Sequence, residues 1–148
     1  SEWGTTPIRS LLEAEMAPYA QHSEGVLELE GPDVELAPND ALSLGLAIHE
    51  LAPNASKYGA LSQSGGRVHV SWELLSDECA KIFWQESGGP SVPEKRSAGF
   101  GTNLIERIVA YELKSPVDLD FDHDGVKCTL IVPIRKPSDF AIRATQNS

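Results

Sequence analysis

The sequence lacks several features that membrane-spanning helices and cysteine-ligated metal sites need. No apolar run in its 148 residues approaches the roughly 18 residues of a membrane helix, and the first residues lack the apolar stretch of a signal peptide. Only two cysteines are present, Cys79 and Cys128, and their spacing matches no metal site, so both are expected to be reduced thiols in a core. These absences predict a cytoplasmic chain without membrane contact.

Basic residues are also scarce. The chain has 12 Lys and Arg against 22 Asp and Glu, which gives a formal net charge of −10. Such a charge disfavours binding to nucleic acid and to anionic membranes. It does not exclude an anionic nucleotide, because a local pocket that holds Mg2+ can override the overall sign. Without internal repeats, the length predicts a single domain over residues 1–135 and a tail at residues 136–148.

The first half of the chain is expected to form two helices and two short strands. Thr6 and Pro7 are typical of a helix start, apolar residues follow at helical spacing, and Pro18 is expected to end that helix. A second helix is expected to begin after Pro38, with Asn39 or Asp40 as its cap. The predicted elements are helices at residues 7–17 and 39–57, and strands at residues 26–30 and 34–36 joined by a turn.

The second half is richer in strands. Val68, Val70 and Trp72 alternate with polar residues, as in one strand of a half-buried antiparallel pair. A stretch rich in Gly, Ser and Pro predicts an irregular loop, and a third helix is expected to begin near Thr102 or Asn103. The predicted elements are strands at residues 67–75, 80–86, 117–121 and 126–134, with the loop at residues 87–99.

This order of elements predicts the fold class. It lacks the regular β-α-β alternation of a Rossmann domain, so that fold is excluded. Runs of strands with inserted helices indicate an α+β protein built as a two-layer sandwich. We expect a mixed, mostly antiparallel sheet of about five strands, covered on one face by three helices.

The densest group of reactive side chains lies in the second predicted helix. At about 100° per residue, Glu50, Asn54 and Lys57 share an arc of roughly 60° beside an apolar arc. A carboxylate and an amide oxygen one turn apart suit Mg2+ with its water shell, and a lysine one turn further suits a phosphate oxygen. The alternative is an ordinary solvated stripe of the helix.

Two glycine-containing motifs follow. Gly99-Phe100-Gly101-Thr102-Asn103-Leu104 runs into a helix start, where backbone amides and the helix dipole attract phosphate. Glu86 and Gly88 lie where a predicted strand ends, so that the acid is placed to accept the exocyclic amine of adenine while the glycine lets the base approach. Taken singly, each motif also fits a simple glycine turn.

Together the three motifs resemble the Bergerat ATP-binding fold shared by gyrase, heat-shock chaperones, histidine kinases and mismatch-repair ATPases. Within that superfamily the chain is most similar to the HWE histidine kinases, in a resemblance that spans about residues 3–134. The features that carry this likeness are His49, the run Lys57-Tyr58-Gly59-Ala60-Leu61-Ser62, Trp84-Gln85-Glu86, Gly99-Phe100-Gly101 and Leu104-Ile105-Glu106-Arg107.

The resemblance implies an ATP- and Mg2+-dependent protein-histidine kinase domain. It would transfer the γ-phosphate of ATP to a histidine of an upstream dimerisation domain of the same kinase, and a response regulator would be a further partner. The resemblance assigns catalysis to Glu50 and Asn54, and Mg2+ binding to Asn54 with Glu50 acting through water. Lys57 and Tyr58 would contact phosphate, and Glu86 and Gly88 would recognise adenine. The triphosphate cradle would consist of Gly99, Phe100, Gly101, Thr102, Asn103 and Leu104.

Two prolines depart from the family pattern. Pro53 stands where threonine is usual and removes the amide that would bond to the carbonyl of His49, so a kink is expected there. Pro90 stands where a second glycine is usual, which HWE members allow.

The histidines do not supply an obvious phosphoacceptor. His49-Glu50-Leu51 begins like one, but the residues after it fit the nucleotide-binding motif, and His22, His69 and His123 lie outside any motif. Two alternatives to the histidine kinase are an anti-sigma-factor-type serine kinase of the same superfamily and a nucleotide-free module that docks a response regulator.

Overall fold

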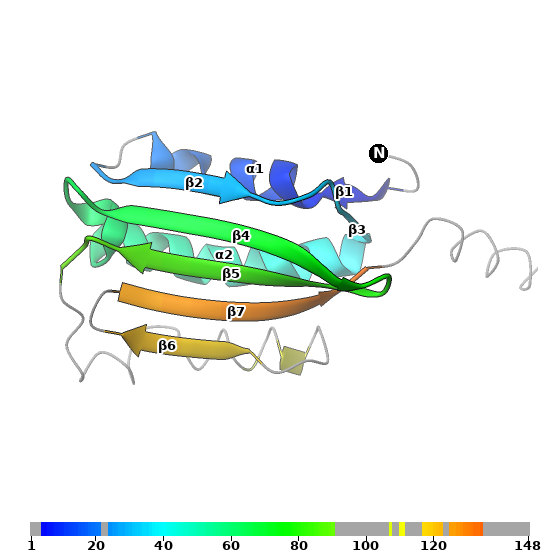
Figure 1. The fold of residues 1–148 in the computed structure, drawn as a ribbon. Coiled ribbons are helices and arrows are strands. Elements are labelled where there is room, and N and C mark those ends of the chain that lie inside the picture. The colour runs from blue at the N-terminus through cyan, green and yellow to red at the C-terminus, as the bar shows by residue number, and fades with distance from the viewer. Residues whose placement is uncertain are drawn as a thin grey trace, which may run out of the picture.

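A mixed sheet forms one layer of the molecule (Figure 1). The structure is a computed structural model that describes residues 4–21, 24–90, 107, 110–111, 117–122 and 125–134. Within these residues the main sheet has five strands in the order β2-β4-β5-β7-β6, of which only the β2–β4 pair is parallel. The strands are β2 (Val26–Glu30), β4 (Arg67–Ser76), β5 (Cys79–Ser87), β6 (Asp118–Asp122) and β7 (Gly125–Pro133).

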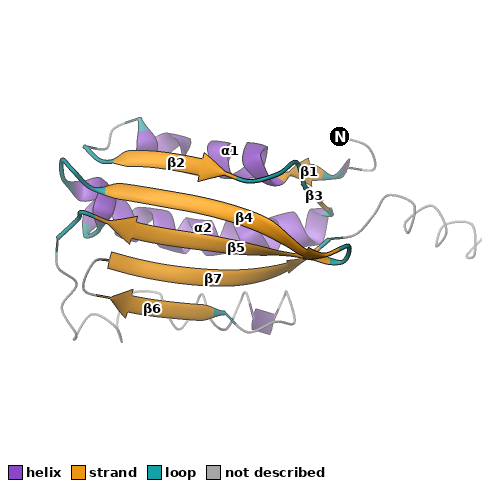
Figure 2. Cartoon of the chain, viewed as in Figure 1, coloured by secondary structure: helices purple, strands orange, loops and turns teal. Residues whose placement is uncertain are grey.

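Helices cover one face of this sheet (Figure 2). Helix α1 spans Ile8–Ala20 and helix α2 spans Pro38–Lys57, and the two pack against each other. Arg107, Ala110 and Tyr111 are helical, while the rest of the third expected helix lies outside the described residues. The α+β two-layer prediction is thereby confirmed. None of the described helices is both long and apolar enough to span a membrane.

The core lies between the sheet and the helices. The alternation predicted for β4 is confirmed, since Val68, Val70 and Trp72 are buried and the residues between them are not. Burial of each large apolar side chain contributes about 1.5–3 kcal/mol of transfer free energy. The helices supply Ile8, Leu12, Met16, Leu44, Ile48 and Leu51, and the sheet adds Ile82, Trp84, Cys128, Leu130 and Val132.

Three local predictions were wrong in detail. Pro18 does not end α1, which continues to Ala20, because a proline in the last turn removes only one helical bond and the amide of Gln21 still donates to Ala17. Neither Asn39 nor Asp40 caps α2. The helix begins at Pro38, whose fixed φ suits the first position and whose missing amide needs no cap.

The third difference is a strand pairing. The short strand β3 (Glu35–Leu36) does not return onto β2 but pairs with β1 (Thr6–Pro7) in a separate two-stranded sheet. Thr6 is therefore part of a strand rather than a helix cap, and the amide of Ile8 donates to the carbonyl of Val34 at 2.8 Å.

Candidate functional site

Helix α2 carries the predicted acid, amide and lysine. Glu50 and Asn54 are half-buried, and Lys57 is exposed in the last turn. The apolar residues of the neighbouring arc, Leu44, Ile48, Leu51 and Ala55, are all buried. One amide and one carboxylate make a small donor set, which fits Mg2+ because this ion keeps several waters and takes further ligands from phosphates.

The C-terminal end of α2 is closed by backbone bonds. The amides of Tyr58 and Gly59 both donate to the carbonyl of Asn54, at 2.9 and 3.0 Å. Pro53 does not end the helix, which continues to Lys57. The chain then enters the short 3-10 helix η2 (Ala60–Ser62).

Glu86 lies buried against this end of α2. Its side chain, only 2% exposed, comes from β5 and faces the helices, on the same side of the strand as Trp84. Oε1 accepts a hydrogen bond from the amide of Ala60 at 3.0 Å, and Oε2 accepts one from the indole Nε1 of Trp84 at 3.0 Å. Burial raises the pKa of Glu86, and the bonds from Ala60 and Trp84 oppose that rise because they favour the charged form.

Glycines allow the segments around Glu86 to approach closely. A β-carbon on Gly59 would overlap Oε1 of Glu86. Gly88 has a φ of +69°, and the place of its β-carbon is taken by the carbonyl of Gly65. These contacts explain why residue 88 is a glycine even without a bound base, so the contact of Gly88 with adenine stays a prediction.

Replacing Gly59 by alanine is expected to destabilise the domain by about 1–3 kcal/mol, because the new methyl group would press on the Glu86 carboxylate. Chemical unfolding measures the loss. Gly45→Ala is the control, since Gly45 lies buried within α2 and its β-carbon would be 3.6 Å from the nearest atom, Oε1 of Glu15. That variant is expected to keep or gain stability, by up to about 1 kcal/mol. Equal stability of the two variants would contradict the expectation.

The bond between Ala60 and Glu86 was not predicted from the sequence. The two residues are 26 positions apart in the sequence. The available signal was the density of glycines at Gly59, Gly65, Gly66 and Gly88, which indicates backbones in close contact.

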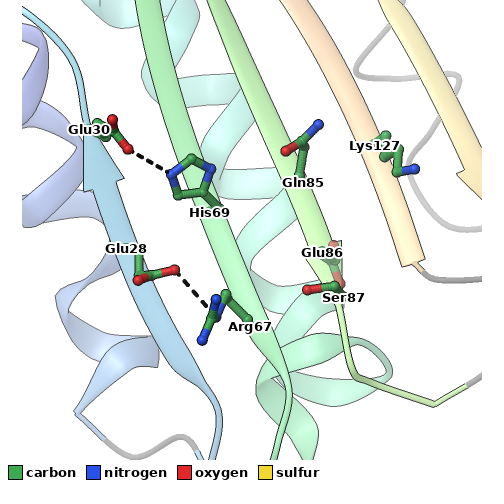
Figure 3. Close-up of a pocket in the computed structure, with 8 residues that line it drawn as sticks. All are labelled: Glu28, Glu30, Arg67, His69, Gln85, Glu86, Ser87 and Lys127. Carbon is green, nitrogen blue, oxygen red and sulfur yellow. Dashed lines mark hydrogen bonds and ion pairs between the residues drawn. The ribbon is translucent and has the colours of Figure 1, made fainter.

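A polar hollow of about 530 Å³ opens on the other face of the sheet (Figure 3). Two side-chain contacts cross it, with Arg67 Nε 3.3 Å from Glu28 Oε1 and His69 Nε2 3.3 Å from Glu30 Oε2. The hollow lies across the sheet from α2 and is therefore separate from the predicted phosphate ligands. Its lining residues are Glu28, Glu30, Arg67, His69, Gln85, Glu86, Ser87 and Lys127.

Two features that the sequence singled out remain, the histidine at position 49 and the predicted triphosphate cradle. His49 Nε2 lies 3.5 Å from Glu15 Oε2 of α1, and the His49 side chain is 62% exposed. The predicted triphosphate cradle, residues 99–104, lies outside the described residues. The structure therefore joins Glu86 to the end of α2 and leaves the cradle as a prediction.

The chain is similar in sequence to proteins named as blue-light-activated histidine kinases. It is 39% identical over 133 residues to blue-light-activated histidine kinase 1 of Erythrobacter litoralis, and 33% identical over 136 residues to the blue-light-activated histidine kinase of Brucella anthropi. These matches cover 88% and 90% of this chain but only 36% and 28% of those proteins. The chain thus spans about a third of their length. No protein-family model matches it.

Solved structures show the same fold. The blue-light activated histidine kinase EL346 of Erythrobacter litoralis has a TM-score of 0.69 and 18% identity, over 90% of this chain and 43% of that one. The nucleotide-free catalytic domain of the histidine kinase ThkA has a TM-score of 0.65 and 16% identity, over 88% of this chain and 95% of that one. The predicted Bergerat-type sandwich is therefore confirmed as the fold of histidine kinase catalytic domains.

Proposed function

We propose that this chain, a histidine kinase catalytic domain of the HWE type, binds Mg-ATP and transfers its γ-phosphoryl group to a histidine on a phosphoacceptor domain outside this sequence. The observation that carries the proposal is the buried Glu86 carboxylate, held at the end of the helix that bears Asn54 and Lys57. Such a buried acid, whose pKa is raised by burial and which is held at the end of a helix bearing an amide and a lysine, supports a binding role.

Each predicted ligand has a distinct task in this proposal. Asn54 would hold Mg2+, and Glu50 would order the water around it. Lys57 and Tyr58 would contact phosphate oxygens, and the glycines and helix start of residues 99–104 would cradle the triphosphate. Bound Mg2+ would neutralise phosphate charge. Phosphoryl transfer needs this positioning and neutralisation more than covalent help from the protein.

The partners follow from the same proposal. A response regulator would receive the phosphoryl group from the phosphohistidine, and the domain would act in the cytoplasm, where ATP is supplied. Both assignments are supported by the similarity to histidine kinases.

ATP is expected to bind at least about tenfold more tightly than GTP, because the Glu86 carboxylate accepts the exocyclic amine of adenine and guanine carries a carbonyl there. Glu86→Gln is expected to reduce the preference to about threefold or less, since an amide offers a donor as well as an acceptor. Isothermal calorimetry in the presence of Mg2+ measures both affinities.

The control for this experiment is Gln85→Ala. Gln85 is exposed on the opposite side of β5 and lines the polar hollow, so its loss should leave the ATP preference unchanged. A thermal scan gives an independent check of binding, because a ligand at a hundred times its Kd adds about 2.7 kcal/mol of stability. Equal affinity of the wild type for ATP and GTP would remove Glu86 from adenine recognition.

A further inference from the structure

Trp84 and Glu86 form a buried pair on one strand. They are two residues apart on β5, both face the helices, and they are 1% and 2% exposed. The indole Nε1 of Trp84 donates to Glu86 Oε2 at 3.0 Å, while the amide of Ala60 donates to Oε1 at 3.0 Å. The carboxylate is therefore held at both oxygens, by donors from two different segments of the chain.

We infer that Trp84 is a positioning residue for nucleotide choice, whose indole N–H fixes the Glu86 carboxylate in the orientation that accepts the exocyclic amine of adenine. This inference rests on the proposed function, in which Glu86 reads that amine. Trp84 itself does not need to touch the base.

The hydrogen-bonding capacity of the carboxylate supports this role. Its two oxygens offer about four acceptor sites, of which Trp84 and Ala60 occupy one each. The remaining sites can receive a ligand amine only in directions that the two protein donors set. A carboxylate held at one oxygen alone is free to rotate out of that orientation.

The charge of Glu86 gives Trp84 a second way to act. Burial favours the protonated acid, and the Trp84 bond opposes this by stabilising the anion. An ionised carboxylate only accepts hydrogen bonds, so it repels the carbonyl that guanine carries in place of the adenine amine. A protonated acid can donate to that carbonyl. Loss of the indole donor is therefore expected to weaken the contact with the adenine amine and to make the guanine carbonyl easier to accept.

The length of the acid matters to the same pair. The Glu86 side chain spans the gap between Trp84 on its own strand and Ala60 beyond the end of α2. Aspartate is shorter by one carbon–carbon bond, about 1.5 Å, and cannot reach both donors from the same backbone position. Glutamate at position 86 is thus matched to the two donors by its length.

The experiment compares three ligands with the wild-type chain and its variants. Mg-ATP, Mg-GTP and the Mg2+ complex of purine riboside triphosphate, which lacks the amine, are titrated by calorimetry. The variants are Trp84→Phe and a chain in which residue 84 is 3-benzothienylalanine, which keeps the shape of tryptophan but has sulfur in place of the N–H. The wild type should prefer ATP over the amine-free ligand by at least about tenfold.

Both variants should reduce that preference at least about fivefold and should bind the amine-free ligand within about twofold of the wild type. The affinity of both variants for Mg-GTP, relative to their affinity for Mg-ATP, should rise. Trp72→Phe is the matched control, because Trp72 is also buried, at 3% exposure, and its indole donates to the carbonyl of Pro32 at 2.7 Å, away from Glu86. The Trp72→Phe variant should lose stability and keep the wild-type preference for Mg-ATP over the amine-free ligand.

The outcomes separate this inference from the function on which it rests. If the wild type discriminates by the amine and both residue-84 variants discriminate equally well, the inference fails and the adenine role of Glu86 stands. Equal weakening of all three ligands would mean that Trp84 only fills the core, which also overturns the inference. A wild type that binds ATP and the amine-free ligand equally would overturn the adenine role of Glu86 and the inference with it.

Discussion

Replacing Asn54 by aspartate is expected to lower phosphoryl transfer to a supplied phosphoacceptor domain by about a hundredfold or more, or about 2.7 kcal/mol in the activation free energy. The change keeps the size of the side chain but puts an anion in place of a neutral ligand, close to the triphosphate. Both Mg2+ coordination and phosphate placement should suffer. Transfer of label from γ-labelled ATP, followed over time, measures the rate.

The fold should tolerate this change. At the end of α2, the amides of Tyr58 and Gly59 bond to the backbone carbonyl of residue 54, and a new side chain does not remove those bonds. Ser56→Asp is the control, since it adds the same charge to the same turn at about 200° around the helix from Asn54. We expect its transfer rate to stay within about twofold of the wild type. Transfer at the wild-type rate by Asn54→Asp would exclude Asn54 as the Mg2+ ligand.

The elements that the sequence predicted well are those whose signal is local. Alternating apolar residues in β4 and helical spacing in α2 each report which side of a single element is buried, and both predictions are confirmed. The pairing of β3 with β1 could not be predicted in the same way. It joins Thr6 to Leu36, thirty residues away, and two short strands carry too few residues to indicate a partner.

The candidate site shows the same limit. Spacing placed Asn54 and Lys57 on one stripe of α2 and identified Glu86 as a strand-end acid. It did not reveal that Ala60 would donate to Glu86, because that bond depends on how closely two backbones approach. The close approach depends in turn on missing β-carbons, such as that of Gly59, whose effect appears only in three dimensions. Residues 99–104 remain predictions because they lie outside the described chain.

The positions of the described histidines support the proposal that the nucleophile lies elsewhere. Transfer requires a histidine nitrogen within about 3–3.5 Å of the γ-phosphorus and in line with the leaving oxygen. His49 lies about 100° around α2 from Glu50 and pairs with Glu15 of α1. His69 pairs with Glu30 on the sheet face away from the helices. His69 thus lies on the opposite face of the sheet from the Glu86 side chain, and His49 contacts α1.

The isolated chain is therefore expected to bind Mg-ATP and to incorporate no acid-labile phosphate. Adding the phosphoacceptor segment of the kinase, in cis or in trans, should restore incorporation on a histidine outside this sequence. The purified chain is incubated with γ-labelled ATP with and without that segment, and acid-labile label is mapped by mass spectrometry. His49→Gln serves as the control and should support transfer in trans at close to the wild-type rate, because the exposed His49 side chain pairs with Glu15 of α1. Stoichiometric phosphohistidine at His49 would contradict the expectation, and the predicted roles of Glu50 and Asn54 on the same helix would fail with it.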